Sequence, residues 1–205
     1  MYIALAEPLS GKRSKKIRFS LDDGSNIVLY KREAKRFGLE EGDEISEELW
    51  GRLMDEVFIP RARSRAMHLL EKQDRTVAGL RRKLCEAGYP ERAIDAAIAY
   101  VESYHYLDDG RYAASYVRYH QYGKSRRRIR MDLRSKGISD ELIDRAIETE
   151  FTNSEEDMIR AAVAKRGYDA ASADLREKQK LYRFLLGRGF SYESIDRAIM
   201  DRDRE

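Results

Sequence analysis

The stretch of this sequence with the densest positive charge runs from residue 122 to residue 138 and reads YGKSRRRIRMDLRSKGI. It contains five arginines and two lysines against one aspartate. Guanidinium groups can pair with a phosphate or carboxylate through two parallel hydrogen bonds, and ammonium groups bind them as point charges. The chemistry that this run offers is therefore the binding of an anionic partner.

No other set of side chains has the spacing of a catalytic or metal-binding site. The three histidines lie far apart in the sequence without paired ligand spacing, and the single cysteine, Cys85, excludes an intramolecular disulfide. No glycine-rich loop precedes a Lys-Ser/Thr pair, and no nucleophile is spaced for activation by a base. We expect a protein that is not an enzyme and binds no cofactor or metal.

Three stretches of sequence repeat one pattern and show which element carries the arginine run. LCEAGYPERAIDAAI from Leu84, LRSKGISDELIDRAI from Leu133 and LLGRGFSYESIDRAI from Leu185 superimpose without gaps. In each copy the glycine is expected to end one helix, and the isoleucines to line the buried side of the next. The copies start 49 and then 52 residues apart, which leaves room for one leading helix in each. The repeating unit is therefore a three-helix bundle.

The sequence before the repeats predicts a small β-containing element. Apolar and polar residues alternate from Ile17 to Leu21, a turn follows, and the alternation resumes at Ile27, which is typical of a β-hairpin. Ser46 is expected to cap a helix that Pro60 breaks or kinks.

The predicted fold is mainly α-helical. It is an elongated array of three tandem three-helix repeats, which resemble helix-turn-helix units, preceded by the β-hairpin-containing element. The predicted divisions are residues 1–58 for the N-terminal element and residues 59–107, 108–150 and 151–205 for the three repeats.

The repeat places the arginine run on the second helix of the second copy. If Ser125 is the N-cap, Ile129 and Leu133 define the buried side of this helix. Three arginines then form a ridge beside that side and two point to solvent: Arg126, Arg130 and Arg134 in the ridge, and Arg127 and Arg128 toward solvent. A solvated face normally interleaves both signs of charge, whereas this helix has only Asp132 to offset its arginines. The unrelieved repulsion favours an anionic partner.

The expected contact surface adds two arginines from the equivalent helix of the first copy and two tyrosines beside the run. Its residues are Arg81, Arg82, Tyr119, Tyr122, Lys124, Arg126, Arg127, Arg128, Arg130, Arg134 and Lys136. The tyrosines could stack on a base or insert at a protein interface. Two partners fit: the phosphate backbone of DNA, bound without reading its sequence, and an acidic groove of a protein.

Any attraction for an anion must come from local charge asymmetry. The 205 residues include 40 Lys and Arg against 37 Asp and Glu, a net charge of only +3. From Arg111 to Lys136, nine basic residues stand against one acid, whereas Glu40 to Glu56 holds eight acids and one base. The longest apolar run has six residues, far fewer than the roughly 20 of a membrane span. We expect a monomer in the cytoplasm, not attached to a membrane.

These motifs together resemble the RecX family, the bacterial regulators of the RecA recombinase. The resemblance rests on LRRKLCEAGYPERAIDAAI in the first copy, on the junction YLDDGRYAASYVRYH, and on GKSRRRIRMDLRSKGISDELIDRAI in the second copy. It runs from about Ile59 to Arg197. The third copy departs from the pattern, because Tyr182 and Phe184 replace the basic residues around its leucine.

The resemblance implies a molecule that lies in the helical groove of the RecA filament and inhibits its ATPase, strand-exchange and co-protease activities. It therefore implies a role in regulating homologous recombination, DNA repair and the SOS response. The implied partners are the RecA filament and single- or double-stranded DNA, bound directly or within the filament. The alternative left open is a nonspecific DNA-binding protein that acts independently of RecA.

Overall fold

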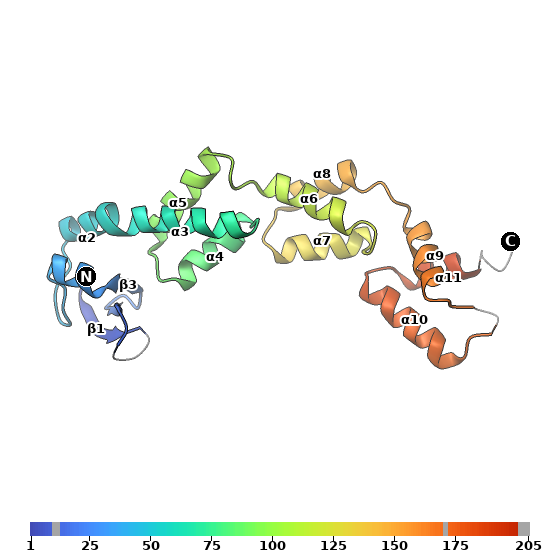
Figure 1. Cartoon of the computed structure of the whole chain (residues 1–205), viewed down its shortest axis with the longest axis horizontal. Helices are drawn as coiled ribbons and strands as arrows, with labels where there is room; N and C mark the ends of the chain where they lie inside the picture. The colour runs from blue at the N-terminus through green and yellow to red at the C-terminus, as the bar shows by residue number, and fades with distance from the viewer. Residues whose placement is uncertain (10–12, 170–171, 201–205) are drawn as a thin grey trace. The chain divides into compact units, whose positions relative to one another are not determined.

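A computed structural model describes residues 1–9, 13–169 and 172–200 of the chain (Figure 1). The chain divides into two compact units, Met1–Asp108 and Asp109–Glu205. Each unit has its own buried apolar cluster: one joins the N-terminal sheet to the first repeat, and the other joins the second and third repeats. The four-part division predicted from the sequence is finer than these two units and stays a prediction.

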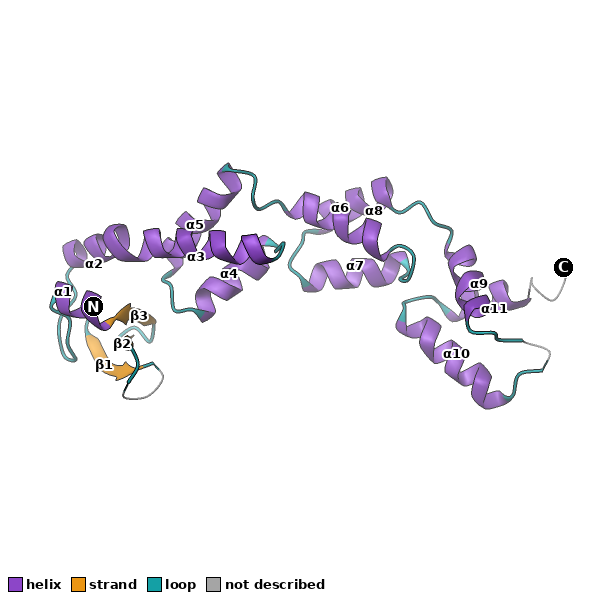
Figure 2. Cartoon of the chain, in the orientation of Figure 1, coloured by secondary structure: helices purple, strands orange, loops and turns teal. Residues whose placement is uncertain are grey.

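A three-stranded antiparallel sheet in the order β1–β2–β3 begins the N-terminal unit (Figure 2). Its strands are β1 (Ile3–Pro8), β2 (Lys16–Leu21) and β3 (Asn26–Tyr30). The predicted hairpin corresponds to β2 and β3. The extra strand β1 gives no clear signal in the sequence, because its register shifts between Ile3 and Leu5, so that Ile3 is buried and Leu5 is exposed.

The two faces of the β2–β3 hairpin differ in chemistry, as the alternation of side chains along a strand requires. One face is apolar and lies in the core, with Phe19, Leu21, Ile27 and Leu29 almost fully buried. The other face is mostly polar and pairs Lys16 with Tyr30, Arg18 with Val28, and Ser20 with Asn26 across the two strands. The apolar face of the hairpin therefore packs into the core, and the polar face lies outside the core.

Two short helices lead from the sheet into the first repeat: α1 (Lys31–Phe37) and α2 (Glu47–Leu53). Ser46 caps α2 as predicted, accepting a hydrogen bond from the N–H of Leu49. The helix does not end at Pro60, because α2 continues through a π-helical turn, Met54–Phe58, into α3. There the N–H of Ile59 bonds to the carbonyl of Met54, five residues earlier. The wider turn accommodates a proline, which has no N–H and crowds the preceding turn.

The three predicted helices of each repeat are present (Figure 2). The first repeat consists of α3 (Ile59–Lys72), α4 (Val77–Glu86) and α5 (Glu91–Ser103). The second consists of α6 (Asp109–His120), α7 (Arg126–Ser135) and α8 (Asp140–Glu150). The third consists of α9 (Glu155–Lys165), α10 (Leu175–Gly187) and α11 (Tyr192–Met200).

The glycine of the repeat motif ends the second helix of each copy in the left-handed conformation. Gly88, Gly137 and Gly189 have φ values of +80°, +83° and +89°. Such φ values strain any residue that carries a Cβ atom, which explains why all three copies have glycine here. Ser139 and Ser191 cap the following helices as predicted.

Two of these glycines also allow a neighbouring element to approach the turn closely. In the N-terminal unit, a Cβ atom on Gly88 would lie 2.5 Å from a methyl group of Val28 in β3. In the C-terminal unit, a Cβ atom on Gly189 would lie 2.5 Å from Oγ of Ser125 and 2.6 Å from Cβ of Arg128. Real Cβ atoms do not tolerate such distances, so the glycine turn is a docking point as well as a helix end.

We expect Gly189→Ala to lower the free energy of unfolding by about 1–3 kcal/mol more than Gly167→Ala, because only Gly189 faces packed atoms. Gly167 also has a left-handed φ, +63°, but nothing lies within 4 Å of its Cβ position. The backbone strain, about 1–2 kcal/mol, is therefore common to both variants. Urea unfolding followed by circular dichroism measures the two losses. Equal losses would contradict tight docking of α7 on the Gly189 turn.

Candidate partner-binding surface

The arginine run forms α7, and the sequence predicts its buried side correctly. Arg127 is exposed as predicted, but the prediction that Arg128 points to solvent is wrong, because Arg128 is half-buried and pairs with Asp132. Ser125 is the N-cap and accepts a hydrogen bond from the N–H of Arg128. Ile129 and Leu133 are fully buried. The first turn of α7 also holds the third repeat: the N–H of Ser125 donates to the carbonyl of Arg188 at 3.0 Å, and the N–H of Arg126 donates to Glu155 at 2.8 Å.

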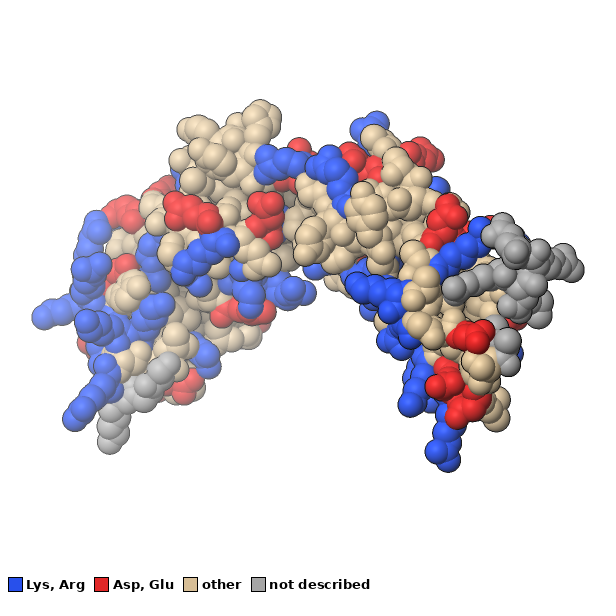
Figure 3. Space-filling model, turned by 45° about the vertical axis from the view of Figure 1, so that its right-hand side comes forward, with Lys and Arg blue, Asp and Glu red and all other residues tan. Residues whose placement is uncertain are grey.

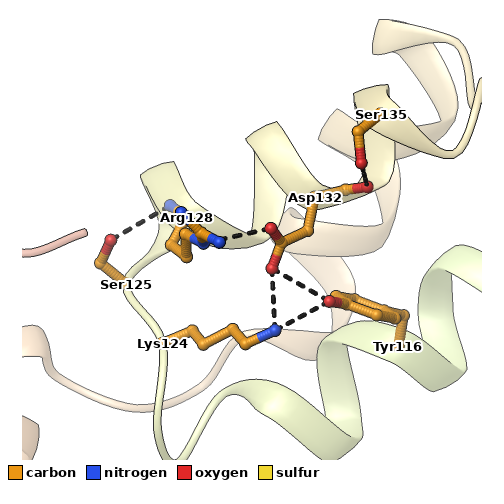
Figure 4. A network of polar contacts seen from close by, with 6 residues as sticks. All are labelled: Tyr116, Lys124, Ser125, Arg128, Asp132 and Ser135. Carbon is orange, nitrogen blue, oxygen red and sulfur yellow. Dashed lines mark hydrogen bonds and ion pairs between the residues drawn. The ribbon is translucent and has the colours of Figure 1, made fainter. Parts of the chain in front are cut away.

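A polar network surrounds the single carboxylate of α7, Asp132 (Figure 4). Its Oδ2 accepts hydrogen bonds from Nζ of Lys124 at 2.8 Å and from the hydroxyl of Tyr116 at 3.0 Å. Its Oδ1 pairs with Nε of Arg128 at 3.1 Å, and Nζ of Lys124 also donates to the hydroxyl of Tyr116 at 2.9 Å. One carboxylate thus holds two of the predicted contact residues and ties α7 to α6.

The network shifts the pKa values of its members. Burial alone would raise the pKa of Asp132, but hydrogen bonds from Lys124 and Tyr116 outweigh it and hold that pKa below its usual value. Burial likewise opposes the charge on Lys124, and the hydrogen bonds to Asp132 and Tyr116 outweigh it and raise the pKa of Lys124. Both shifts favour the ion pair near neutral pH, so the network stabilises the fold there.

The ridge predicted on α7 is not an unpaired row of cations. Arg130 forms an ion pair with Asp144, and Nε of Arg134 lies 2.5 Å from Asp140; both carboxylates belong to α8. The guanidinium of Arg126 lies over the ring of Phe151, 4.7 Å from its centroid. The premise that only Asp132 offsets these arginines is therefore wrong, because the neighbouring helix of the same repeat supplies two more acids.

The repeat motif contains the signal that the sequence analysis missed. Its aspartate recurs in all three copies, and in each it contacts the residue that lies three positions before the motif leucine. These pairs are Arg81 with Asp95, Arg130 with Asp144, and Tyr182 with Asp196. The aspartate therefore links the third helix of each repeat to the second. In the first two copies its partner is an arginine, Arg81 or Arg130, which already has this structural role.

The remaining predicted contact residues are more open. Tyr119 and Tyr122 are 82% and 74% exposed, the highest values among the large apolar and aromatic side chains of the described residues. Arg127 is exposed and has no carboxylate partner in the part of the chain that the structure describes. Lys136 lies over the rings of Tyr112 and Tyr116.

Arg81 and Arg82 belong to the other compact unit. Arg81 pairs with Glu91 as well as with Asp95, and Arg82 is exposed. The most exposed of the predicted contact residues lie around the α6–α7 connection: Tyr119 near the end of α6 and Tyr122 in the connection, followed by the arginines of α7.

The described residues contain no group of three His, Cys, Asp or Glu side chains that could hold a metal ion. Among the same residues, no helix is long and apolar enough to cross a membrane. Cys85 is exposed and forms no disulfide.

Three three-helix units in tandem define a helical-repeat protein. Comparison with known families makes the assignment specific. Models of the first, second and third three-helix domains of RecX match residues 62–100, 108–147 and 154–199, respectively. The chain belongs to the RecX family of regulatory proteins, as the sequence motifs predict.

Individual relatives support the same assignment. The regulatory protein RecX of Vibrio campbellii is 38% identical over 141 residues, which are 68% of this chain and 90% of that protein. The regulatory protein RecX of Caldanaerobacter subterraneus is 32% identical over 164 residues, 79% of this chain and 81% of that protein.

Solved structures of RecX proteins share the fold. A crystal structure of a regulatory protein RecX matches 98% of both chains, with a TM-score of 0.61 and 27% identity. RecX from Lactobacillus salivarius matches 72% of this chain and 97% of its own, with a TM-score of 0.60 and 26% identity.

We expect Asp132→Asn to lower the free energy of unfolding at pH 7 by about 1–2 kcal/mol, because it leaves Lys124 without its carboxylate. Asp132 has a lowered pKa in the folded state, so its contribution is present above the unfolded pKa, about 3.9, and is lost as the pH falls through the folded value. The variant should therefore lose part of the acid dependence of stability. Urea unfolding between about pH 2 and 7 measures this.

The matched control is Asp140→Asn, which breaks an exposed pair with Arg134. Water screens that pair, so a smaller loss is expected. A loss as large as that of Asp132→Asn would show that the Asp132 network contributes no more than a surface ion pair.

Proposed function

We propose that this protein binds the RecA recombinase filament and inhibits its ATPase, strand-exchange and co-protease activities, and so regulates recombination and DNA repair. The observation that carries this proposal is the match of all three RecX domains, in order and each reaching from the first to the third helix of its unit. The relatives named regulatory protein RecX support the regulatory part of the proposal.

The contact surface that we propose for the filament is centred on Tyr119, Tyr122 and Arg127. Tyrosine and arginine are enriched among the residues that dominate binding energy at protein interfaces, because they combine a large contact area with directed polar groups. These three side chains are exposed, and none is held by a carboxylate in the described residues. Their use in an interface breaks no intramolecular ion pair.

Arg130 and Arg134 can take part at the edge of this surface. Their partners Asp144 and Asp140 are themselves half exposed, so these ion pairs are weakened by water. If a carboxylate of the filament took the place of these aspartates, the protein would lose little folding stability. Lys124 and Arg128 are a different case, because Asp132 holds both in a partly buried network that a partner would have to dismantle.

The alternative, DNA binding independent of RecA, has less support from α7. Most of the cations that suggested it already lie against carboxylates of α7 or α8. The open side chains, Tyr119, Tyr122 and Arg127, have the chemistry of a protein interface, so filament binding is the function that we propose for this surface.

We expect the purified protein to inhibit RecA ATPase and strand exchange at stoichiometric ratios. The variant Tyr119→Ala/Tyr122→Ala/Arg127→Glu should need at least about tenfold more protein for half-maximal inhibition, because it removes the open interface anchors. Titrations against RecA alone, DNA alone and the assembled filament separate the partners.

The control is Arg145→Glu, an exposed charge reversal on α8 of the same repeat. It should inhibit like the natural sequence. The proposed function is abandoned if the natural protein leaves both activities unchanged, whereas equal inhibition by the triple variant removes only the proposed surface.

A further inference from the structure

A large hollow lies in the N-terminal unit, which does not carry the α6–α7 surface. A groove of about 990 Å³ runs between the polar face of the β2–β3 hairpin, α3, and the turn that joins α4 to α5. Basic side chains enter it from both sides: Lys16 and Arg18 from the sheet, and Arg61 and Arg65 from α3. The groove exists because Gly88 lets the α4–α5 turn pack directly on Val28 at one point of the sheet face.

A second hollow of about 520 Å³ adjoins the groove at a shared residue, Tyr30. It is lined by the end of the β1–β2 loop and the start of α1, and its lining is Arg13, Ser14, Lys15, Tyr30, Lys31 and Arg32. The linings of the two hollows meet at Tyr30, and we call the two together the basic groove. Figure 3 shows Lys and Arg side chains close together on the part of the N-terminal unit that carries the sheet.

Most cations of this basic groove have no acid beside them. Arg13, Lys15, Lys16, Lys31, Arg32 and Arg65 have no carboxylate within ion-pair distance among the described residues. The two acids of the lining are already engaged, since Glu86 pairs with Lys83 and Glu91 pairs with Arg81. Arg18 and Arg61 do have partners, Glu7 at 3.5 Å and Glu33 at 2.8 Å, so the unbalanced positive charge is that of the other six.

The ring of Tyr30 lies close to two cations without a carboxylate partner, Lys16 and Arg32, and to Arg61, which also pairs with Glu33. Arg61, Lys16 and Arg32 lie 4.7, 5.2 and 5.8 Å from its centroid. Attraction to the ring offsets part of the repulsion between the cations. Because cations already surround the ring, it is poorly placed to stack on a base. The groove is built to bind charge and not to read bases.

The lining also argues against a protein partner. Protein interfaces are centred on large exposed apolar or aromatic anchors. The exposed ones in the described part of this unit, which include Tyr2, Leu5, Tyr104 and Tyr106, line neither hollow. What remains is a row of lysines and arginines, the composition that binds a polymer of phosphates by displacing its counterions.

We propose that this basic groove binds the phosphodiester backbone of a DNA strand, independently of sequence and without RecA. The N-terminal element then gives the chain a nucleic-acid contact of its own, in a different unit from the proposed filament surface. This inference does not rest on the proposed function, and either can fail alone.

The test is the fluorescence anisotropy of a labelled oligodeoxythymidine titrated with the full chain in the absence of RecA. Lys15→Glu/Lys31→Glu/Arg65→Glu, three exposed positions of the groove, should bind at least about tenfold more weakly at about 50 mM salt. It should also show a smaller salt dependence, with a logarithmic slope reduced by about 0.7 for each phosphate that the variant no longer neutralises.

The matched control is Arg145→Glu/Lys165→Glu/Arg176→Glu, which changes the net charge equally at exposed positions of the other unit. It should bind within about twofold of the natural protein. Equal losses in the two triple variants would reduce the effect to net charge and overturn the proposal, as would the absence of a loss in the groove variant or of any binding by the natural protein.

Two further measurements keep the result interpretable. Thermal unfolding checks that the groove variant is folded, and Lys15→Gln/Lys31→Gln/Arg65→Gln removes the charges without introducing acids; it should weaken binding in the same direction. Polyglutamate is the competitor that separates phosphate from carboxylate chemistry. If it displaces the oligonucleotide as well as unlabelled DNA of equal charge does, the groove accepts any polyanion and the assignment to DNA is wrong.

Discussion

The rest of the structure depends on the left-handed glycine that joins the second and third helices of each repeat. A residue with a Cβ atom would be strained there, and in two of the copies it would also collide with a neighbouring element. Gly88 admits the sheet at Val28, and Gly189 admits the start of α7 at Ser125. The turn thus joins the second and third helices of a repeat. At Gly88 and Gly189 it also provides the contact with a neighbouring element of the same unit.

Charge density along the chain and charge density in space differ in this protein. The arginine run is the most basic stretch of the sequence, yet acids of α7 and α8 balance most of its cations, because the repeat packs these two helices together. The cations around Tyr30 come from separate segments of the chain, and none of those segments is conspicuous alone. Tertiary packing neutralises the first set and gathers the second.

The two proposed binding surfaces differ in chemistry. Open tyrosines and an arginine at the α6–α7 connection have the chemistry of a protein interface, and the groove around Tyr30 has the chemistry of a phosphate-binding surface. They lie in different compact units, so each can be altered without disturbing the core of the other. The matches to the RecX domain models lie within residues 62–199, so the N-terminal sheet is outside them.

The sequence by itself determined the three helices of each repeat, the glycine turns, the buried face of α7, the β2–β3 hairpin and the family. All of these depend on local spacing, through the period of a helix or strand and the conformational freedom of glycine. Only the tertiary structure decided which charges are balanced, because the partners of Arg130 and Arg134 lie on another helix. It also decided that β1 completes the sheet and that a basic groove surrounds Tyr30, since both depend on contacts between segments far apart in the chain.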